Sequence, residues 1–394
     1  MTGAMYAAIA GLRTHMQNLN VIGNNVANVN TYGYKSARSV FKTALYTTLS
    51  GGSDGTAVLG GANPSQIGYG ATMGSIGIDM STGNYAVTGM ATDLMLDGEG
   101  FFILSDKTTA DQFDGTGGDQ SVLNGMKLTR VGNFTFGPDG YLAKEDDGQC
   151  VYGFLCTGYD QNGNATYSDQ LVPIRLPGLR VNDDGTKEVV YPSVQPAAGG
   201  QGQGNGHLTD ATHEVTVGGQ TVTEPYAKVE LSGITIDKNT GIITGTTKDT
   251  NELITIGVIA VGNVKNPNGV TNLGDNYYQA GEGSGGLSVS LLGGAAQSMF
   301  GTPTDPSGKA YYMNQSLVNN QQGGGNGNAD EVSDACRLRS GGKTRVLQNG
   351  LEMSKTDLAQ EISQMILTQR GYQANTRIIT VTDSMLEELV NMKR

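Results

Sequence analysis

The sequence contains no tryptophan, only three histidines and only three cysteines, and charged residues make up 16% of its 394 positions. His15, His207 and His213 are isolated from one another and lack an HExxH spacing, so they do not indicate a metal site or a general base. Without tryptophan there is no obvious aromatic platform for stacking a sugar. The sequence therefore offers little of the chemistry that most enzymes use.

Disulfide patterns and long apolar runs are equally scarce. Cys150, Cys156 and Cys336 form no CxxC pair, and their odd number argues against a complete disulfide framework, although a Cys150–Cys156 disulfide across a hairpin stays open. The longest strongly apolar stretch, residues 253–261, is about half of what a membrane-spanning helix needs. The N-terminus lacks the charged and apolar regions of a conventional signal peptide.

Three short motif matches fail in their context. Residues 51–55 have the letters of a G-x-S-x-G nucleophile elbow, but a loop follows where a helix is required. Residues 160–171 begin like a calcium loop and end in leucine instead of glutamate, which indicates a hairpin turn. Glycines 202, 204 and 206 do not open a helix, as a dinucleotide fingerprint would. We expect no enzyme, no metal site and no cofactor.

The net charge of −12 is concentrated in the middle of the chain. Residues 1–53 carry four basic and no acidic side chains, and residues 351–394 carry five basic and six acidic ones. Residues 54–350 therefore hold a net charge of −15. An acidic body argues against a nucleic-acid partner and fits a surface that faces solvent.

The N-terminal residues predict a helix with one apolar stripe, followed by a turn. The two seam positions of the heptad pattern hold Met5, Leu12, Leu19 and Val26, and Ile9 and Met16. The pattern stops in an asparagine-rich segment that is typical of a helix end and turn: Asn24, Asn25, Asn28, Asn30, Thr31 and Gly33.

The C-terminal residues predict a longer helix, from 355 to about 391. Ser354 and Asp357 fit a capping box at its start, with Ser354 as the N-cap. One seam position holds Leu358, Met365, Tyr372, Ile379 and Leu386, and the other holds Ile362, Gln369, Thr376, Asp383 and Val390. A helix this long must bury its stripe, either against the N-terminal helix alone or also against other copies of the chain.

The residues between these helices are rich in short β-forming runs separated by glycine and asparagine turns. Residues 179–250 look like a β unit inserted between two other runs, and residues 285–345 look like an irregular glycine-rich excursion. We predict a multidomain α+β protein in which a terminal α-helical coiled coil encloses mainly-β domains nested as insertions.

Four motifs, in the same order along the chain, resemble the rod and hook family, the axial proteins of the bacterial flagellum. They are residues 18–35 with the asparagine-rich turn, ATDLMLDGEGFF at 91–102, TRVGNF at 129–134 followed by DGYL at 139–142, and residues 350–389 with QRGYQAN at 369–375. Distal rod members of this family are shorter, and a chain of this length with an inserted β domain is more similar to the hook members.

The resemblance implies a layered subunit. Residues 1–35 and 351–394 would form the coiled-coil core, 36–75 an extended connector, 76–178 and 251–350 a β-rich middle domain, and 179–250 an outer β domain. The implied function is a self-assembling curved tube that transmits motor torque to the filament. The implied partners are the chain itself, the distal rod, the hook cap, the hook–filament junction proteins and the flagellar type III export apparatus, with no nucleic acid and no membrane insertion.

The family's export and cross-linking chemistry suggests further residues. Phe41 and Leu45 match its short F-x-x-x-apolar export-gate motif, and the implied location is extracellular, reached without a cleaved signal peptide. A partly buried connector segment would give the same letters. Some hook proteins also join a cysteine to a lysine of the next subunit, which any of the three cysteines could do. The alternatives are a long rod protein, a surface-layer or adhesin-like β protein, or an enzyme acting on a polysaccharide or peptide.

Overall fold

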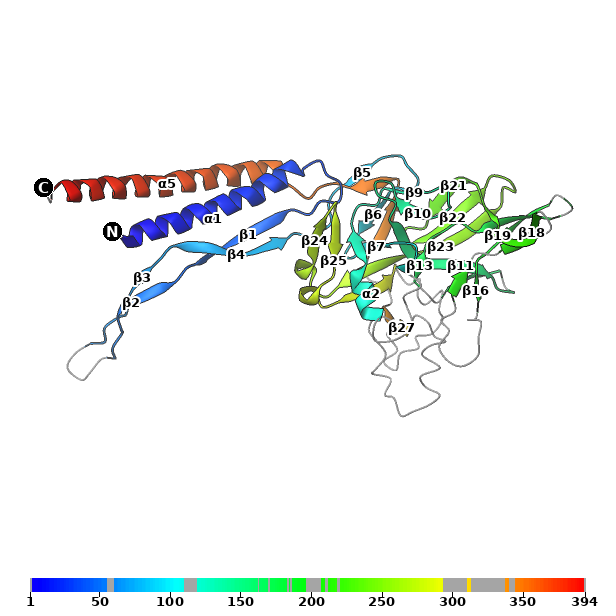
Figure 1. Ribbon diagram of the computed structural model, residues 1–394, viewed down its shortest axis with the longest axis horizontal. Helices are drawn as coiled ribbons and strands as arrows, with labels where there is room; N and C mark the ends of the chain where they lie inside the picture. Colours follow the sequence, from blue (N-terminus) through cyan, green and yellow to red (C-terminus); the bar gives the residue numbers. More distant parts are fainter. Residues whose placement is uncertain are drawn as a thin grey trace. The chain divides into compact units, whose positions relative to one another are not determined.

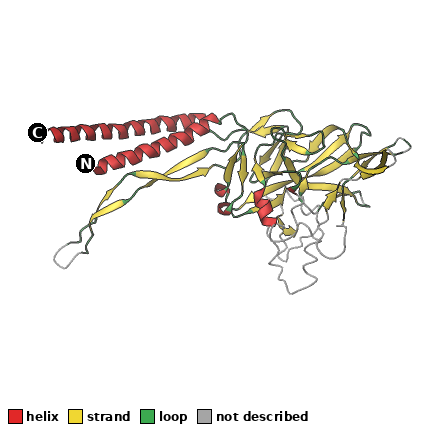
Figure 2. Cartoon of the chain, viewed as in Figure 1, coloured by secondary structure: helices red, strands yellow, loops and turns green. Residues whose placement is uncertain are grey.

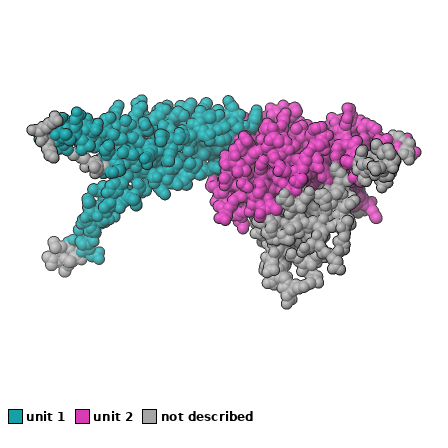
Figure 3. All heavy atoms as spheres, in the orientation of Figure 1, with its two compact units in different colours: residues 1–79, 354–394 teal, residues 80–353 magenta. Residues whose placement is uncertain are grey.

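The computed structural model describes residues 2–54, 60–109, 119–161, 163–168, 171–182, 184, 186–195, 207–209, 212–217, 220–292, 310–312, 337–339 and 344–392. The chain divides into two compact units, residues 1–79 with 354–394 and residues 80–353, which Figure 3 colours teal and magenta. Helices at the chain ends and strands between them confirm the predicted α+β class (Figures 1 and 2).

Unit 1 contains the two long helices. Helix α1 spans Thr2–Ala27 and α5 spans Leu358–Asn391. The predicted start of α5 is wrong by three residues, because Asp357 and not Ser354 caps it: the Asp357 carboxylate accepts hydrogen bonds from the backbone N–H groups of Ala359 and Gln360. Both residues are good caps, but the carboxylate also interacts favourably with the positive end of the helix dipole.

Unit 1 also contains a β-hairpin arm, defined here as residues 37–78. Strand β1 (Ala37–Thr43) pairs antiparallel with β4 (Ala71–Ile78), and β2 (Tyr46–Ser50) pairs with β3 (Ser65–Gly68). The residues expected to form an extended connector, 36–75, thus form most of a two-stranded ribbon. Such a ribbon is marginal on its own and needs a surface to pack against.

Unit 2 is built on a large, mainly antiparallel sheet around two long strands, β11 (Cys150–Tyr159) and β23 (Leu253–Val264). Both strands are buried along most of their length, as their continuous apolar runs require. The sheet order is β24-β25-β8-β7-β11-β23-β26-β28-β27, with β9, β10, β12, β13, β21 and β22 branching from it. Its core includes Phe102 and Phe134, whose rings pack edge to face with their centroids 5.0 Å apart.

The remaining members of this sheet are short. They are β7 (Phe101–Ser105), β8 (Lys127–Thr129), β9 (Phe134–Phe136), β10 (Leu142–Lys144), β12 (Ala165–Tyr167), β13 (Val172–Pro173), β21 (Leu231–Ile236), β22 (Ile242–Thr247), β24 (Thr271–Gly274), β25 (Tyr277–Gln279), β26 (Leu287–Leu291), β27 (Ala310–Tyr312) and β28 (Arg337–Arg339). Three short helices accompany them: α2 (Asp119–Gly125), η2 (Pro267–Gly269) and η3 (Glu282–Ser284).

Smaller ladders complete unit 2. Strand β14 (Gly178–Val181) pairs with β15 (Lys187–Val190) and β20 (Ala227–Lys228), β16 (Ser193–Gln195) with β17 (His207–Thr209), and β18 (Thr212–Val217) with β19 (Gln220–Pro225). The segment expected to be an outer domain, 179–250, is therefore divided, because β21 and β22 join the large sheet through β23. In the segment expected to be irregular, 285–345, the described residues include β26, β27 and β28.

The first and last strands of unit 2 pair with each other. Strand β5 (Tyr85–Val87) pairs with β30 (Gly350–Glu352), and β6 (Leu94–Asp97) pairs with β29 (Arg345–Gln348). These two ladders join residues from the start of the unit to residues from its end. The unit is thus closed as an insertion between the two halves of unit 1.

The possible Cys150–Cys156 disulfide is ruled out by the structure. Both cysteines are free and buried, and both lie on β11. Six residues of extended chain separate their Cα atoms by roughly 20 Å, far beyond the reach of a disulfide. Burial raises the pKa of each thiol to about 11. Cys336 lies outside the described residues.

Candidate assembly site at the terminal helices

Helices α1 and α5 pack antiparallel along one seam. As residue numbers rise on α1, the numbers of the facing residues on α5 fall by the same amount, so the register is constant over the shared length. The seam contacts are Gly11 against Asn375, His15 against Gly371, Asn18 Nδ2 donating to Thr368 Oγ1 at 2.9 Å, and Asn25 Nδ2 donating to Glu361 Oε1 at 3.0 Å.

Two glycines allow the helices to approach closely at this seam. A Cβ atom on Gly11 would lie 2.6 Å from Asn375 Nδ2, and one on Gly371 would lie 2.7 Å from His15 Cε1. Glycine inside a helix costs about 1 kcal/mol relative to alanine, so the close approach must offset that cost. The α5 side of the seam recurs every seven residues and is polar: Glu361, Thr368, Asn375 and Thr382.

The apolar heptad residues predicted from the sequence do not dominate this seam. Met5, Ile9, Leu12, Leu19, Val26, Met365 and Ile379 are half-buried within the single chain. The others are exposed: Met16, Leu358, Ile362, Tyr372, Leu386 and Val390. Their assignment to the core of a polymer remains a prediction, and it is taken up below.

The asparagine-rich turn is organised by Asn25, whose side chain is almost completely buried. Its Oδ1 accepts hydrogen bonds from Tyr34 Oη (3.0 Å) and from the backbone N–H of Ala37 (2.9 Å). Its Nδ2 donates to the carbonyl of Ala37 (2.8 Å) and to Glu361. All four hydrogen-bonding positions of the amide are used, and they join α1, the start of β1 and α5.

The other motif residues shape the turn itself. Asn28 Nδ2 donates to the carbonyl of Asn24 at 2.9 Å, and Thr31 Oγ1 donates to Asn28 Oδ1 at 3.1 Å. Gly33 has φ +67°, a conformation that a residue with Cβ rarely adopts. Asn30 is exposed. The letters that carried the family resemblance therefore have a local physical role in ending α1 and redirecting the chain into β1.

Burial raises two pKa values beside Asn25. The pKa of Glu361 is raised by burial and, to a lesser degree, by Asp357, while the hydrogen bond from Asn25 opposes the shift. The pKa of Tyr34 is raised by burial and then by the charge of Glu361. Negative charge is therefore disfavoured at this end of the seam.

The β-hairpin arm packs on α1. Thr14 Oγ1 donates to the carbonyl of Ala71 at 3.0 Å, and Gly70, with φ +98°, lies directly against the backbone of Ala7. The rings of Phe41 and His15 are nearly perpendicular, with their centroids 5.9 Å apart. Phe41 is nevertheless 45% exposed, and Leu45 is 81% exposed. The two residues of the export motif are thus accessible in the folded chain.

A groove of about 620 Å³ lies among the end of α1, β1 and the first two turns of α5. Its apolar lining includes Val21, Ile22 and Phe41. Its charged lining holds two basic and three acidic side chains: Arg38, Lys355, Asp79, Asp357 and Glu361. Asp357 is occupied in capping α5. Arg38 and Lys355 form no ion pair within the described part of the chain.

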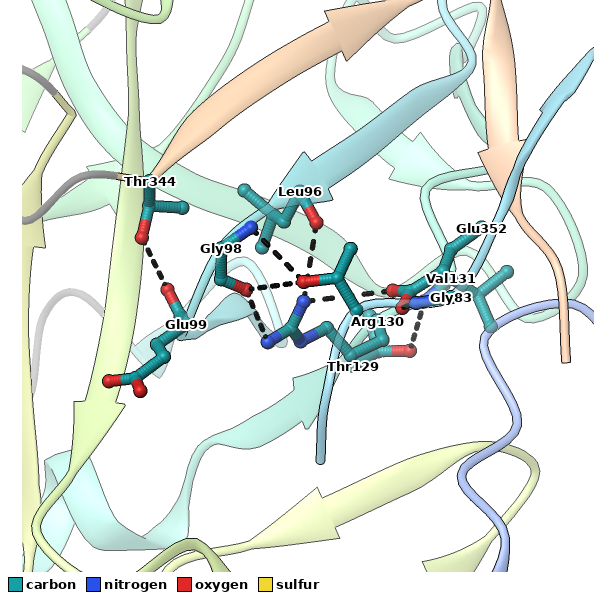
Figure 4. Close-up of polar contacts among 10 residues, drawn as sticks. Gly83, Leu96, Gly98, Glu99, Thr129, Arg130, Val131, Thr344 and Glu352 are labelled. Carbon is teal, nitrogen blue, oxygen red and sulfur yellow. Dashed lines mark hydrogen bonds and ion pairs between the residues drawn. The ribbon is translucent and has the colours of Figure 1, made fainter. Parts of the chain in front are cut away.

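Unit 2 holds a buried ion pair that sequence analysis missed. Figure 4 shows Arg130 surrounded by backbone carbonyls and facing Glu352. The guanidinium donates to the carbonyls of Leu96 (3.3 Å) and Gly98 (2.8 Å), and it lies 3.6 Å from Glu352 Oε2. Glu352 Oε1 accepts a hydrogen bond from the backbone N–H of Gly83. Burial lowers the pKa of Arg130, and the charge of Glu352 opposes that shift.

The ion pair joins two of the sequence motifs. Arg130 belongs to the TRVGNF motif, and Glu352 belongs to the motif that begins at residue 350. Their side chains are 1% and 0% exposed. The sequence does show a charged residue in each motif, which could have drawn attention to both. Nothing in the sequence indicates that these two residues form an ion pair.

The structure describes only part of the motif matches that the sequence analysis dismissed. Across the ranges that the structure describes, no group of three or more His, Cys, Asp and Glu side chains is placed to hold a metal ion. Asp160 Oδ1 accepts a hydrogen bond from the backbone N–H of Asn164 in a hairpin turn. The side chains of His207 and His213 lie outside the described residues. None of the described helices is long and apolar enough to cross a membrane.

Comparison with known proteins supplies the context for these features. Residues 5–35 match the family model described as flagella basal body rod protein, and residues 347–392 match the one described as flagellar basal body rod FlgEFG protein C-terminal. The flagellar basal-body rod protein FlgG of Bacillus subtilis is 28% identical, and the flagellar hook protein FlgE of Borreliella burgdorferi is 26% identical, each alignment covering all of both chains. The hook protein FlgE of Helicobacter mustelae is 32% identical over 39% of this chain and 31% of its own. The chain is thus similar to flagellar rod proteins at both of its ends, and to flagellar rod and hook proteins over its whole length.

Proposed function

We propose that this chain is the structural subunit of a bacterial flagellar hook. It would self-assemble through its terminal helices into a curved, flexible tube that passes motor torque to the filament. The chain length and the inserted β-rich unit support a hook rather than a short rod subunit. The relatives named hook protein, which align over their whole length, support the same conclusion.

One observation carries the self-assembly. Within the single chain, α5 presents a polar seam to α1 and leaves large apolar side chains exposed. They include Leu358, Ile362, Ile366, Leu367, Tyr372, Ile378, Val381, Met385, Leu386, Leu389 and Val390. An exposed apolar surface this extensive marks a protein–protein interface.

The arm adds a second apolar surface to unit 1. Its exposed side chains are Val40, Phe41, Leu45, Tyr46, Leu49, Ile67, Tyr69 and Ile76. Part of the ribbon packs on α1, but these side chains remain exposed within the single chain. Copies of the same chain would cover it in a polymer.

We assign the layers of the tube from these surfaces. Residues 1–35 and 351–394 would form the inner core, and the acidic β-rich residues 76–350 would face outward. Between residues 178 and 228 the strands form small ladders separate from the large sheet. These ladders would slide against neighbouring copies as the tube bends. Distal rod, hook cap, hook–filament junction and export apparatus are the partners that this position implies.

The test compares the full chain with a chain that lacks residues 355–394. Seeded with flagellar basal bodies and viewed by electron microscopy, the full chain should form tubes. The truncated chain should remain monomeric with its β-rich unit still folded, as judged by circular dichroism. A truncated chain that polymerises as well as the full one would contradict the role of the terminal helices.

A rod subunit is the second candidate, because rod proteins FlgG also align over almost the whole of both chains. The shape of the polymer separates the two. Curved tubes that supercoil support a hook, whereas straight, stiff tubes support a rod.

Export through the flagellar type III apparatus is the proposed route to the cell exterior. Phe41 and Leu45 are accessible in the folded arm and would be more so in an unfolded chain. Replacing both by alanine should reduce the amount of chain secreted without reducing its synthesis. Secretion equal to that of the unmodified chain would remove these residues from the route.

A further inference from the structure

Two tyrosine side chains of unit 2 meet through their hydroxyl groups. Tyr159 is the last residue of β11, and Tyr191 directly follows β15. Tyr191 Oη donates a hydrogen bond to Tyr159 Oη at 3.4 Å. The two rings are nearly perpendicular, with their centroids 5.7 Å apart. The contact therefore brings together two phenols from segments that are far apart in the chain.

The contact connects two separate parts of the β structure. Tyr159 belongs to a long strand of the large sheet, and its hydroxyl oxygen also accepts a hydrogen bond from the backbone N–H of Thr255 on β23 at 3.1 Å. Tyr191 continues from the small ladder of β15, β14 and β20, which is separate from the large sheet among the described strands. At the other end of β15, Lys187 Nζ lies 2.6 Å from Asp249 Oδ1. The two phenols are thus one of the links between the small ladder and the large sheet.

An oxidant in the solvent can reach these phenols. Tyr159 is 46% exposed, and Tyr191 is half-buried. The sequence has 17 tyrosines and no tryptophan, so tyrosine is the aromatic side chain that loses an electron most easily. Cys156, on the same strand as Tyr159, is buried, and burial raises the pKa of its thiol to about 11. It therefore remains a thiol near neutral pH and is not the more reactive thiolate.

The hydrogen bond between the two hydroxyls gives a phenolic proton a place to go. Burial raises the pKa of Tyr191, and the hydrogen bond to Tyr159 adds to that shift, so near neutral pH the side chain is a neutral phenol. A neutral phenol that loses an electron becomes a strong acid, and the proton of Tyr191 already points at Tyr159 Oη. Tyr159 can release its own proton to solvent because its side chain is partly exposed. A tyrosyl radical can therefore form at either position beside a second phenol.

We propose that Tyr159 and Tyr191 are a site of oxidative cross-linking, in which a carbon–carbon bond joins the two rings at positions next to their hydroxyl groups. Each phenol first loses one electron and one proton. The two phenoxyl radicals then couple at ring carbons, and the hydrogen displaced from each of these carbons returns to the phenolic oxygen. Hydrogen peroxide accepts the two electrons and two protons and is reduced to two molecules of water. The chain thus loses two hydrogen atoms in total.

The cross-link would fasten the small ladder to the large sheet. The rings now pack edge to face, and the exposed side of Tyr159 leaves room for the ring rotation that coupling needs. A covalent link between distant residues restricts the unfolded chain, as a disulfide does. The small ladder should then open less often by itself. Both residues lie in one chain, so the inference does not depend on the assembly function proposed above.

The test exposes the full chain to hydrogen peroxide and a peroxidase, at a concentration low enough to keep the chain monomeric. Mass spectrometry should find a cross-linked peptide pair that contains residues 159 and 191 and lacks two hydrogen atoms. The protein should gain the fluorescence of dityrosine and still run as a monomer on a denaturing gel. Amide hydrogen exchange in β14 and β15 should slow by at least about tenfold after cross-linking.

Three variants provide the controls. Tyr191→Phe and Tyr159→Phe keep a ring at each position and remove the hydroxyl, and each should reduce the yield of the cross-linked peptide at least tenfold. Tyr141→Phe is the matched control, because the Tyr141 ring lies beside Lys107 and Arg175 instead of a second tyrosine. It should leave the yield unchanged. Amide hydrogen exchange before oxidation shows whether each variant is folded.

Two results would overturn the proposal. One is oxidation that modifies other tyrosines or Cys156, or no residue at all, without linking residues 159 and 191 in the folded chain. The other is an equal yield of this link in a chain unfolded in urea, because the folded contact would then not select the two residues. Neither result would affect the proposed function, which rests on unit 1.

Discussion

Neutralising Glu352 should destabilise unit 2 strongly, because it leaves the Arg130 guanidinium buried without its counter-charge. The two side chains are 1% and 0% exposed, so water cannot replace the lost partner. Removing one member of a buried ion pair costs about 3–5 kcal/mol. Glu352→Gln retains an oxygen that can accept the hydrogen bond from Gly83, so the lower end, about 3 kcal/mol, is the expected loss.

This loss should be visible as a shift in thermal unfolding. For a domain of this size, 1 kcal/mol corresponds to roughly 2–4 °C, so the midpoint of unit 2 should fall by about 6–12 °C. Because the chain lacks tryptophan, amide hydrogen exchange of peptides from β8 and β30 in increasing urea is the suitable local probe. Exchange in both strands should rise together, since the ion pair joins Glu352 of β30 to Arg130, the residue that follows β8.

An exposed ion pair in the same unit provides the control. Glu230 and Lys248 lie 2.9 Å apart, and their side chains are 71% and 67% exposed. Glu230→Gln makes the same chemical change in contact with water, and it should not measurably shift the midpoint. If Glu352→Gln were as mild as Glu230→Gln, the argument from burial would be refuted.

Three further predictions concern the helix pair of unit 1. Asn25→Ala should destabilise it by roughly 2–4 kcal/mol, measured by thermal melting of the helical circular dichroism signal, because several buried hydrogen-bonding partners lose the amide. Gly23→Ala should raise the melting temperature, because nothing lies within 4 Å of the new Cβ. Gly371→Ala should not raise it, because its Cβ would meet His15. Equal increases in melting temperature would disprove the tight seam. Because the pKa of Glu361 is raised on folding, the folded chain binds that proton more tightly, so the stability it contributes is present below about pH 4.5 and is lost as pH rises through the raised pKa. Glu361→Gln should abolish this part of the pH dependence in a series of urea titrations, and an unchanged profile would count against it.

Local sequence information determined the fold class of the protein and its two terminal helices. The seven-residue apolar spacing predicted both terminal helices, and the asparagine-rich segment predicted where α1 stops. These features depend on residues within a few turns of one another, so periodicity and turn chemistry suffice to find them. The motifs around them were enough to reveal the resemblance to flagellar rod and hook proteins.

The tertiary structure alone decided which face of α5 meets α1. Sequence reasoning favoured the apolar stripe through Leu358 and Tyr372, but the covered stripe runs through Thr368 and Asn375. The choice depends on close approach at Gly371 and on hydrogen bonds across the seam. An apolar period in one helix cannot reveal whether its partner is in the same chain or in another copy.

The same limit applies to the start of α5 and to the buried pair of unit 2. Ser354 and Asp357 are both competent caps, and only the folded surroundings select Asp357. Arg130 and Glu352 lie far apart in the chain. Pairing of β30 with β5 places Glu352, and hydrogen bonds to the carbonyls of Leu96 and Gly98 hold Arg130. Sequence by itself determined which secondary structure each segment forms, whereas long-range packing decided which polar groups are buried together. The reason is that the cost of burying a charge depends on neighbouring groups that only the fold supplies.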